Sequence, residues 1–186
     1  MEPGVFVDFH LTAVRGSSMS ASAVGASALF RALHAGFTQL PGRFALALPR
    51  LDRPSPQARL SLFRVFAASL DDLAALHSVL KNGDGLGRLY EARFPEAVPG
   101  DFAGPWVSYR RARIHSRRHA ANCRASTMRQ LDEAGTTWID MGSRENGQRF
   151  RLYLLATRHS ARLTGIPNGY GLSTADAPLA LPLLDN

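Results

Sequence analysis

The sequence predicts an α+β protein with a βαββαβ unit in its first half and an arginine-rich second half. Alternating apolar segments and amphipathic segments follow one another in the order β-α-β-β-α-β up to about residue 94. Beyond residue 109 the composition changes: positions 110–129 hold seven arginines and no acidic residue. The order of the first half is that of a ferredoxin-like, RRM-type unit.

Each element of the first half has its own local signal. The strands alternate apolar and polar residues and are predicted at 4–14, 43–52, 59–68 and 87–94. The first helix extends to about residue 39, and its core-facing stripe has helical spacing: Ala26, Phe30, Leu33 and Phe37. The second helix, 69–80, begins with a serine cap and two acidic residues. The segment PSPQ between the second and third strands is predicted as a turn.

The second half is predicted to begin after a Pro- and Gly-containing linker, 96–105. We expect a ferredoxin-like domain over 1–98 and an RNA-binding domain over 105–186. Within the latter, an extended segment starts at Trp106, an arginine-rich helix runs to about Glu133, and Asn146-Gly147 predicts a β-hairpin. The expected fold class is therefore α+β: a ferredoxin-like domain plus a C-terminal domain with an Arg-rich helix and a hairpin.

The charge balance predicts a polyanionic partner. The 186 residues carry a net charge of +7, and the pI is about 10.7. The only lysine is Lys81, so almost all the positive charge sits on guanidinium groups, which bind phosphate bidentately and stack on bases. Cys123 is the single cysteine, no apolar run approaches a membrane span, and the first residues lack a signal-peptide pattern, so we expect a cytoplasmic protein without membrane attachment.

The acid-free arginines are predicted to bind RNA phosphates. On a helix from about Ser116, Arg117 and Arg124 share one face. Arg118 and Arg129 share the adjacent face, beside a basic strand segment with Arg110, Arg111 and Arg113. Such a helix fits the deep, narrow major groove of A-form RNA. The alternative is a solvated helix face without a partner. Because the first module lacks RNP aromatic residues, we do not expect its sheet to be the RNA platform.

Three histidines are candidates for a chemical role. His34 follows Phe30 by four residues and lies at the border of the buried stripe, so its imidazole is either a general base or a packing residue. His115 and His119 have the i, i+4 spacing of metal ligands, but their cationic surroundings and the absence of a third ligand favour an RNA contact or no role. No metal site and no cofactor are expected.

Three segments in order resemble the CRISPR-associated endoribonuclease of subtype I-F systems. These are ALFRALHAGF (28–37), GQRFRLYL (147–154) and GYGLS (169–173). The resemblance implies a ferredoxin-like domain plus an Arg-helix domain. It also implies metal-independent cleavage of precursor CRISPR RNA at the 3′ base of the repeat hairpin, with a 2′,3′-cyclic phosphate end. The family then stays on the mature crRNA as a subunit of the interference complex.

The resemblance also implies roles for individual residues. His34 would be the general base, Ser143 would hold the ribose, and Tyr170 would orient the imidazole. Phe150 would stack on the terminal base pair of the hairpin. The RNA-binding residues would be Arg110, Arg111, Arg113, His115, Arg117, Arg118, Arg124 and Arg129, with Arg111 and Arg113 near the guanine at the cleavage site.

Two other functions remain open at this point. The first is a non-catalytic subunit of a ribonucleoprotein complex that binds the RNA hairpin without cutting it. The second is a basic DNA-binding protein, although the sequence has neither a helix-turn-helix nor a dimeric groove-reading pattern.

Overall fold

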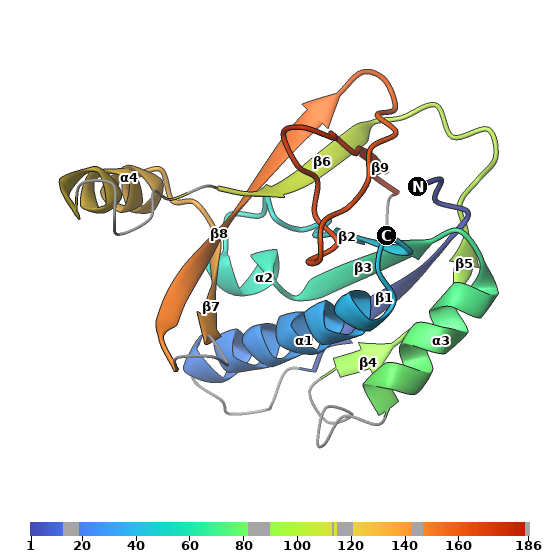
Figure 1. Ribbon diagram of the computed structural model, residues 1–186, viewed down its shortest axis with the longest axis horizontal. Coiled ribbons are helices and arrows are strands. Elements are labelled where there is room, and N and C mark those ends of the chain that lie inside the picture. Colours follow the sequence, from blue (N-terminus) through green and yellow to red (C-terminus); the bar gives the residue numbers. More distant parts are fainter. Residues whose placement is uncertain (13–18, 82–89, 113, 115–120, 143–146, 185–186) are drawn as a thin grey trace.

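A mixed α+β architecture with two antiparallel sheets confirms the predicted class (Figure 1). The computed structural model describes residues 1–12, 19–81, 90–112, 114, 121–142 and 147–184. One hydrophobic core runs through both halves of the chain, because residues such as Phe30 of the first half and Leu172 of the second belong to the same buried cluster.

The first sheet has the strand order β2-β3-β1-β4, with every neighbouring pair antiparallel. Its strands are β1 (Val5–Leu11), β2 (Phe44–Ala47), β3 (Leu62–Ala67) and β4 (Tyr90–Ala92). All four lie within predicted strands; β1, β2 and β3 are shorter than their predictions, and residues 87–89 of the fourth prediction lie outside the described residues. The predicted linker contains a fifth, two-residue strand, β5 (Glu96–Ala97), which pairs with the first residues of β1.

Two helices cover one face of this sheet (Figure 1). They are α1 (Met19–Gln39) and α3 (Leu70–Lys81), both close to their predicted bounds. The predicted stripe of α1 is confirmed, since all four of its residues are at most 2 % exposed. The helices approach closely at Gly36, where an added Cβ would lie 2.7 Å from Leu76 Cδ1. The PSPQ segment differs from the prediction: a short helix, α2 (Pro56–Arg59), starts there with proline in its first turn.

A buried ion pair lies on the other face of the first sheet. Asp8 of β1 faces Arg64 of β3 in register, and two bonds of 2.7 and 2.8 Å join the guanidinium to the carboxylate. Arg64 is 2 % exposed and also donates to the carbonyl oxygen of Leu184, near the chain end. The second half of the chain therefore covers this face, which agrees with the expectation that the sheet is not an open RNA platform.

The second sheet has the order β7-β8-β6-β9, also antiparallel. Its strands are β6 (Trp106–Arg111), β7 (Trp138–Gly142), β8 (Arg149–His159) and β9 (Leu181–Pro182). The predicted hairpin is confirmed in the pairing of β7 with β8, and Gly147 at its turn has a φ of 64°. Helix α4 (Ala121–Glu133) follows β6 and extends away from the body of the molecule (Figure 1).

Candidate functional site: an imidazole beside a basic groove

A short loop near the C-terminus joins the two sheets. The backbone N–H of Leu46 in β2 donates to Gly171 O at 2.8 Å, and the N–H of Ser173 donates to Tyr109 O of β6 at 2.8 Å. Within the loop, Asn168 Oδ1 accepts hydrogen bonds from the backbone N–H groups two and four residues ahead, at 2.8 and 3.2 Å. This side chain acts as an internal cap, so the backbone of 168–173 is held at both ends and in its middle.

The loop places Tyr170 directly on His34. Their rings stack with centroids 4.0 Å apart and planes 17° apart, and Phe30 of α1 stacks on the other side of the tyrosine at 5.6 Å. Nδ1 of His34 lies 2.6 Å from the carbonyl oxygen of Gly169. A carbonyl oxygen only accepts, so Nδ1 carries the proton, and Nε2 is the nitrogen with a free lone pair in the neutral ring. Half-buried at the border of the α1 stripe, the imidazole is fixed in tautomer and orientation.

A groove of about 660 Å³ opens beside this pair. Its walls come from the end of β6, from α4, from β8 and from the 168–173 loop; the lining includes Arg110, Arg111, Thr127, Leu131, Leu155 and Tyr170. Arg110 and Arg111 are both exposed at the end of β6. Tyr170, predicted for the catalytic centre, and Arg110 and Arg111, predicted as RNA ligands, therefore line one groove. His34 is not among the lining residues and adjoins the groove through its contacts with Gly169 and Tyr170.

The arginines of the predicted RNA surface that the structure describes form no ion pair with a described carboxylate. Five ion pairs occur in the described part of the chain, and none involves Arg110, Arg111, Arg124 or Arg129. On α4, Arg129 is exposed and Arg124 is half-buried. The remaining predicted site residues lie outside the described residues: Arg113, His115, Arg117, Arg118 and Ser143.

Phe150 lies elsewhere than the groove. It pairs with Met141 across the β7–β8 hairpin, is half-buried and packs against the core. It is not among the residues that line the groove. Its stacking on the hairpin base stays a prediction, and the structure places Phe150 on the β7–β8 hairpin, outside the groove lining.

An anchor that the sequence analysis missed fixes the C-terminal end of α4. The hydroxyl of Tyr153 on β8 donates to Asp132 Oδ1 at 2.8 Å, and Arg151 forms an ion pair with the same carboxylate at 3.2 Å. The guanidinium of Arg151 also lies 4.3 Å from the centre of the Trp138 ring. Burial raises the pKa of the Tyr153 hydroxyl, which keeps it protonated as the donor. The only signal in the sequence was that Asp132 ends the acid-free stretch.

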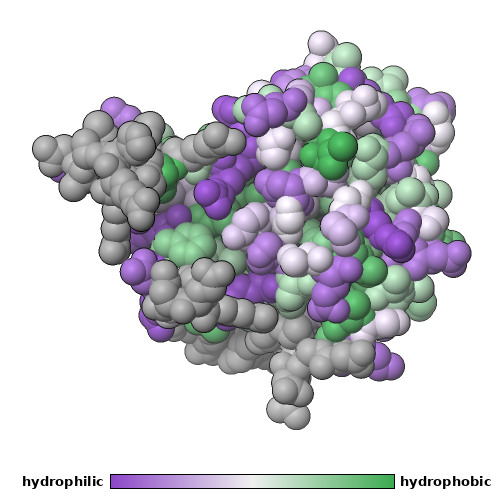
Figure 2. Space-filling model, in the orientation of Figure 1, coloured by the Kyte–Doolittle hydropathy of each residue, from purple (hydrophilic) through white to green (hydrophobic). Residues whose placement is uncertain are grey.

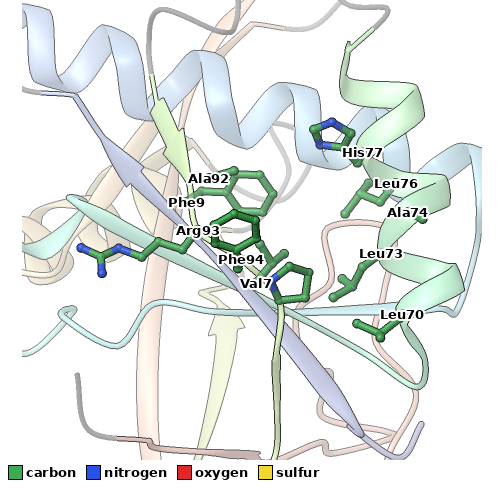
Figure 3. A pocket seen from close by; sticks show the side chains of 11 residues that line it. Val7, Phe9, Leu70, Leu73, Ala74, Leu76, His77, Ala92, Arg93 and Phe94 are labelled. Atoms are coloured by element: carbon green, nitrogen blue, oxygen red, sulfur yellow. The ribbon is translucent and has the colours of Figure 1, made fainter.

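A second hollow, under α3, has a different character (Figure 3). Its volume is about 400 Å³, and its lining is mostly apolar: Val7, Phe9, Leu70, Leu73, Leu76 and Phe94 are among the residues that form it. His77 and Arg93 are its ionisable side chains. Because its lining brings no carboxylate or hydroxyl to the histidine, we assign the chemistry to the groove and not to this hollow.

In the described ranges, no group of three or more His, Cys, Asp or Glu side chains is arranged to hold a metal ion. Among the described helices, none combines the length and the apolar character needed to cross a membrane. The face seen in Figure 2 mixes hydrophilic and hydrophobic residues, with hydrophilic ones spread over most of it.

Comparisons with known proteins assign no family. No protein-family model matches the chain, and no curated protein matches it. One similar solved structure has a title that describes a putative chlorite dismutase. The two chains share 12 % identity over 85 % of this chain and 80 % of the other, with a TM-score of 0.33. A likeness at that score supports no inference about fold family or function.

Proposed function

We propose that the protein is a metal-independent endoribonuclease that cuts a CRISPR repeat RNA at the 3′ base of its hairpin. The observation that carries the proposal is the placement of His34: its ring is held by Gly169 O, stacked on Tyr170 and next to a groove with two exposed arginines. A positioned general base and cationic groups that bind phosphate both promote RNA transesterification.

The reaction starts with proton transfer to His34. Nε2 takes the proton from the 2′-hydroxyl of the nucleotide before the scissile phosphate. The 2′-oxygen attacks phosphorus in line, the bond to the 5′-oxygen breaks, and that oxygen takes a proton from water. The products are a 2′,3′-cyclic phosphate and a free 5′-hydroxyl, so atoms and charge balance without an oxidant or a bound cofactor. Tyr170 holds the imidazole plane, and Ser143 positions the ribose.

The arginines supply affinity and stabilise charge at phosphorus. Arg110 and Arg111 line the groove, where guanidinium groups bind phosphate oxygens bidentately. Arg117, Arg118, Arg124 and Arg129 follow the hairpin phosphates, Arg111 and Arg113 lie near the guanine at the cleavage site, and His115 contacts the RNA. Replacing Arg110 and Arg111 with glutamine is expected to reduce the log–log salt slope of hairpin binding by about 0.7–0.9 per lost phosphate contact. An unchanged slope would place the RNA elsewhere on the protein.

The proposed function includes a domain assignment and partners. The first sheet, together with α1 and α3, belongs to the ferredoxin-like domain, residues 1–98. Residues 105–186 form the RNA-binding domain. The protein keeps the cut hairpin and joins other subunits of a type I-F-like interference complex in the cytoplasm.

The reaction chemistry is tested with labelled repeat RNA in EDTA. Wild-type protein is expected to cut once at the hairpin base and to leave a 2′,3′-cyclic phosphate. A matched RNA with a single 2′-deoxy substitution before the scissile phosphate should bind equally and remain uncut, because the nucleophile is absent. Cleavage of the deoxy substrate would contradict the mechanism. Binding of both RNAs without any cleavage would favour the non-catalytic hairpin-binding subunit.

A further inference from the structure

A third hollow, away from the groove, is lined by three arginines and one carboxylate. Its volume is about 580 Å³, and its lining consists of Pro49, Arg50, Asp52, Arg53, Pro54, Arg158, Leu183 and Leu184. It lies where the chain leaves β2, beside the end of β8 and the last described residues. No residue lines both this hollow, which we name the arginine pocket, and the groove beside His34.

The backbone of the arginine pocket is held in place from outside it. Arg59 of α2 donates to the carbonyl oxygens of Arg53 at 2.6 Å and of Gly135 at 2.7 Å, which ties the 50–54 loop to the turn after α4. Arg50 donates to Ser61 Oγ at 3.0 Å, so its guanidinium has a fixed direction. A loop anchored in this way presents its charges in one arrangement and loses little conformational freedom when a ligand binds.

The charges of the arginine pocket are open to solvent and do not cancel. The ion pair of Arg158 with Asp52 spans 3.2 Å, and the two side chains are 66 % and 63 % exposed. An ion pair this exposed contributes little, so a stronger anion can compete for the guanidinium. Arg53 is exposed and has no ion pair with a described carboxylate. With Arg50 included, three positive charges face one negative charge.

We propose that the arginine pocket binds phosphate groups of single-stranded RNA, as a second RNA site separate from the hairpin groove. Guanidinium forks match phosphate oxygens, and the half-buried Leu183 and Leu184 give an apolar floor for a ribose or a base. The choice of RNA rests on the proposed function: an RNA cut at the 3′ base of its hairpin keeps its single-stranded 5′ segment, which leaves the groove and requires its own contacts. The site itself stands on the pocket's geometry and charge.

Binding of a fluorescent ten-nucleotide oligouridylate, which forms no hairpin, tests the site. The double variant Arg53→Gln/Arg158→Gln is expected to bind about tenfold more weakly than wild type. Its log–log salt slope should fall by about 1.4, for two single-strand contacts at about 0.7 each. The matched control, Arg43→Gln/Arg162→Gln, removes the same charge from two exposed ion pairs elsewhere and should bind as wild type does. Equal binding by the pocket variant and the control would overturn the proposal.

Two further variants separate the pocket from general electrostatics and from the groove. Asp52→Asn removes the pocket's only carboxylate and should tighten oligouridylate binding several-fold, whereas Glu2→Gln, which also releases an exposed arginine, should not. Arg110→Gln/Arg111→Gln should retain most of the binding. If only that groove variant lost it, the single strand would bind in the groove and the pocket would have no role. Cleavage is not measured here, so failure of the proposed nuclease activity would be seen separately.

Discussion

Replacement of Gly171 by alanine tests whether the 168–173 loop holds the site together. This glycine has a φ of +73°, and a Cβ added there would lie 2.7 Å from Phe37 Cε2 and 3.0 Å from the backbone nitrogen of Leu46. The left-handed conformation costs a residue with a Cβ about 1–2 kcal/mol. Pressing a methyl group into a packed core costs typically about 1–3 kcal/mol more. Because Phe37 is 2 % exposed and Leu46 belongs to β2, neither neighbour has free space to move into.

The sum predicts that Gly171→Ala lowers the free energy of unfolding by about 2–5 kcal/mol. At about 2–4 °C per kcal/mol for a chain of this size, the melting temperature should fall by roughly 4–20 °C. The same displacement moves Tyr170 off the His34 ring, so RNA cleavage should slow even at temperatures where the variant is folded. Urea unfolding, thermal unfolding and single-turnover cleavage measure the three effects.

Gly169→Ala is the matched control in the same loop. Gly169 has no left-handed φ, and its added Cβ would lie 3.7 Å from His34 Cε1, an ordinary van der Waals distance. Its stability should stay within about 1 kcal/mol of wild type, with a small gain expected because alanine lowers the conformational entropy of the unfolded chain. If both variants lost the same stability, or if Gly171→Ala lost none, the close packing of the loop against α1 and β2 would be refuted.

Three other predictions address the interior, the pH dependence and the loop. Asp8→Ala leaves the Arg64 charge buried without its carboxylate and should lower the free energy of unfolding by about 3–5 kcal/mol. Glu2→Ala, at an exposed ion pair, should lower it by less than about 1 kcal/mol. Equal losses for the two variants in urea titrations would contradict this. The pKa of His10 is lowered by folding, so its contribution to stability is complete above the unfolded-state pKa of about 6.5 and is lost as the pH falls below that value. His10→Gln should therefore weaken the pH dependence of the melting temperature between pH 7 and 5. An identical pH dependence in the variant would show that His10 is not its source. Asn168→Ala removes the acceptor of two backbone N–H groups, so it should slow cleavage and lower the free energy of unfolding by about 1–2 kcal/mol. Asn168→Asp keeps the accepting oxygen and should have the cleavage rate and stability of wild type. An aspartate variant as impaired as the alanine variant would refute the capping role.

Elements with strong periodicity could be predicted from the sequence. The stripe of α1 and the pairing of β7 with β8 each followed from a local pattern that tertiary structure did not override. The three missed elements are short: β5, α2 and β9, a two-residue strand that pairs with β6. β5 has two residues and exists only through pairing with β1, and α2 spans a single turn whose proline had suggested a bend. Such elements depend on their neighbours and leave little trace in a sequence window.

The sequence indicated which residue types belong to the candidate site, but not which of them come into contact. A position at the border of the stripe singled out His34, but its contact with Tyr170 depends on the hydrogen bond between Leu46 and Gly171, which are 125 residues apart in the chain. No periodicity encodes a contact at that separation. The arginine pocket was missed for a similar reason: Arg53 and Arg158 come from different halves, and only the fold brings them to one hollow.

The most direct test of the central claim is the single-turnover cleavage of repeat RNA by His34→Ala in EDTA, beside His77→Ala as a control for an exposed histidine outside the groove. The imidazole takes a proton from a sugar hydroxyl and holds no phosphate, so the RNA affinity of His34→Ala should equal that of wild type. Its cleavage rate should fall by about 10²–10⁴-fold, the usual loss for a positioned general base. His77→Ala should cut at the wild-type rate. Cleavage by His34→Ala within a few-fold of wild type would contradict the account, because the imidazole would then serve only to pack α1 against Tyr170.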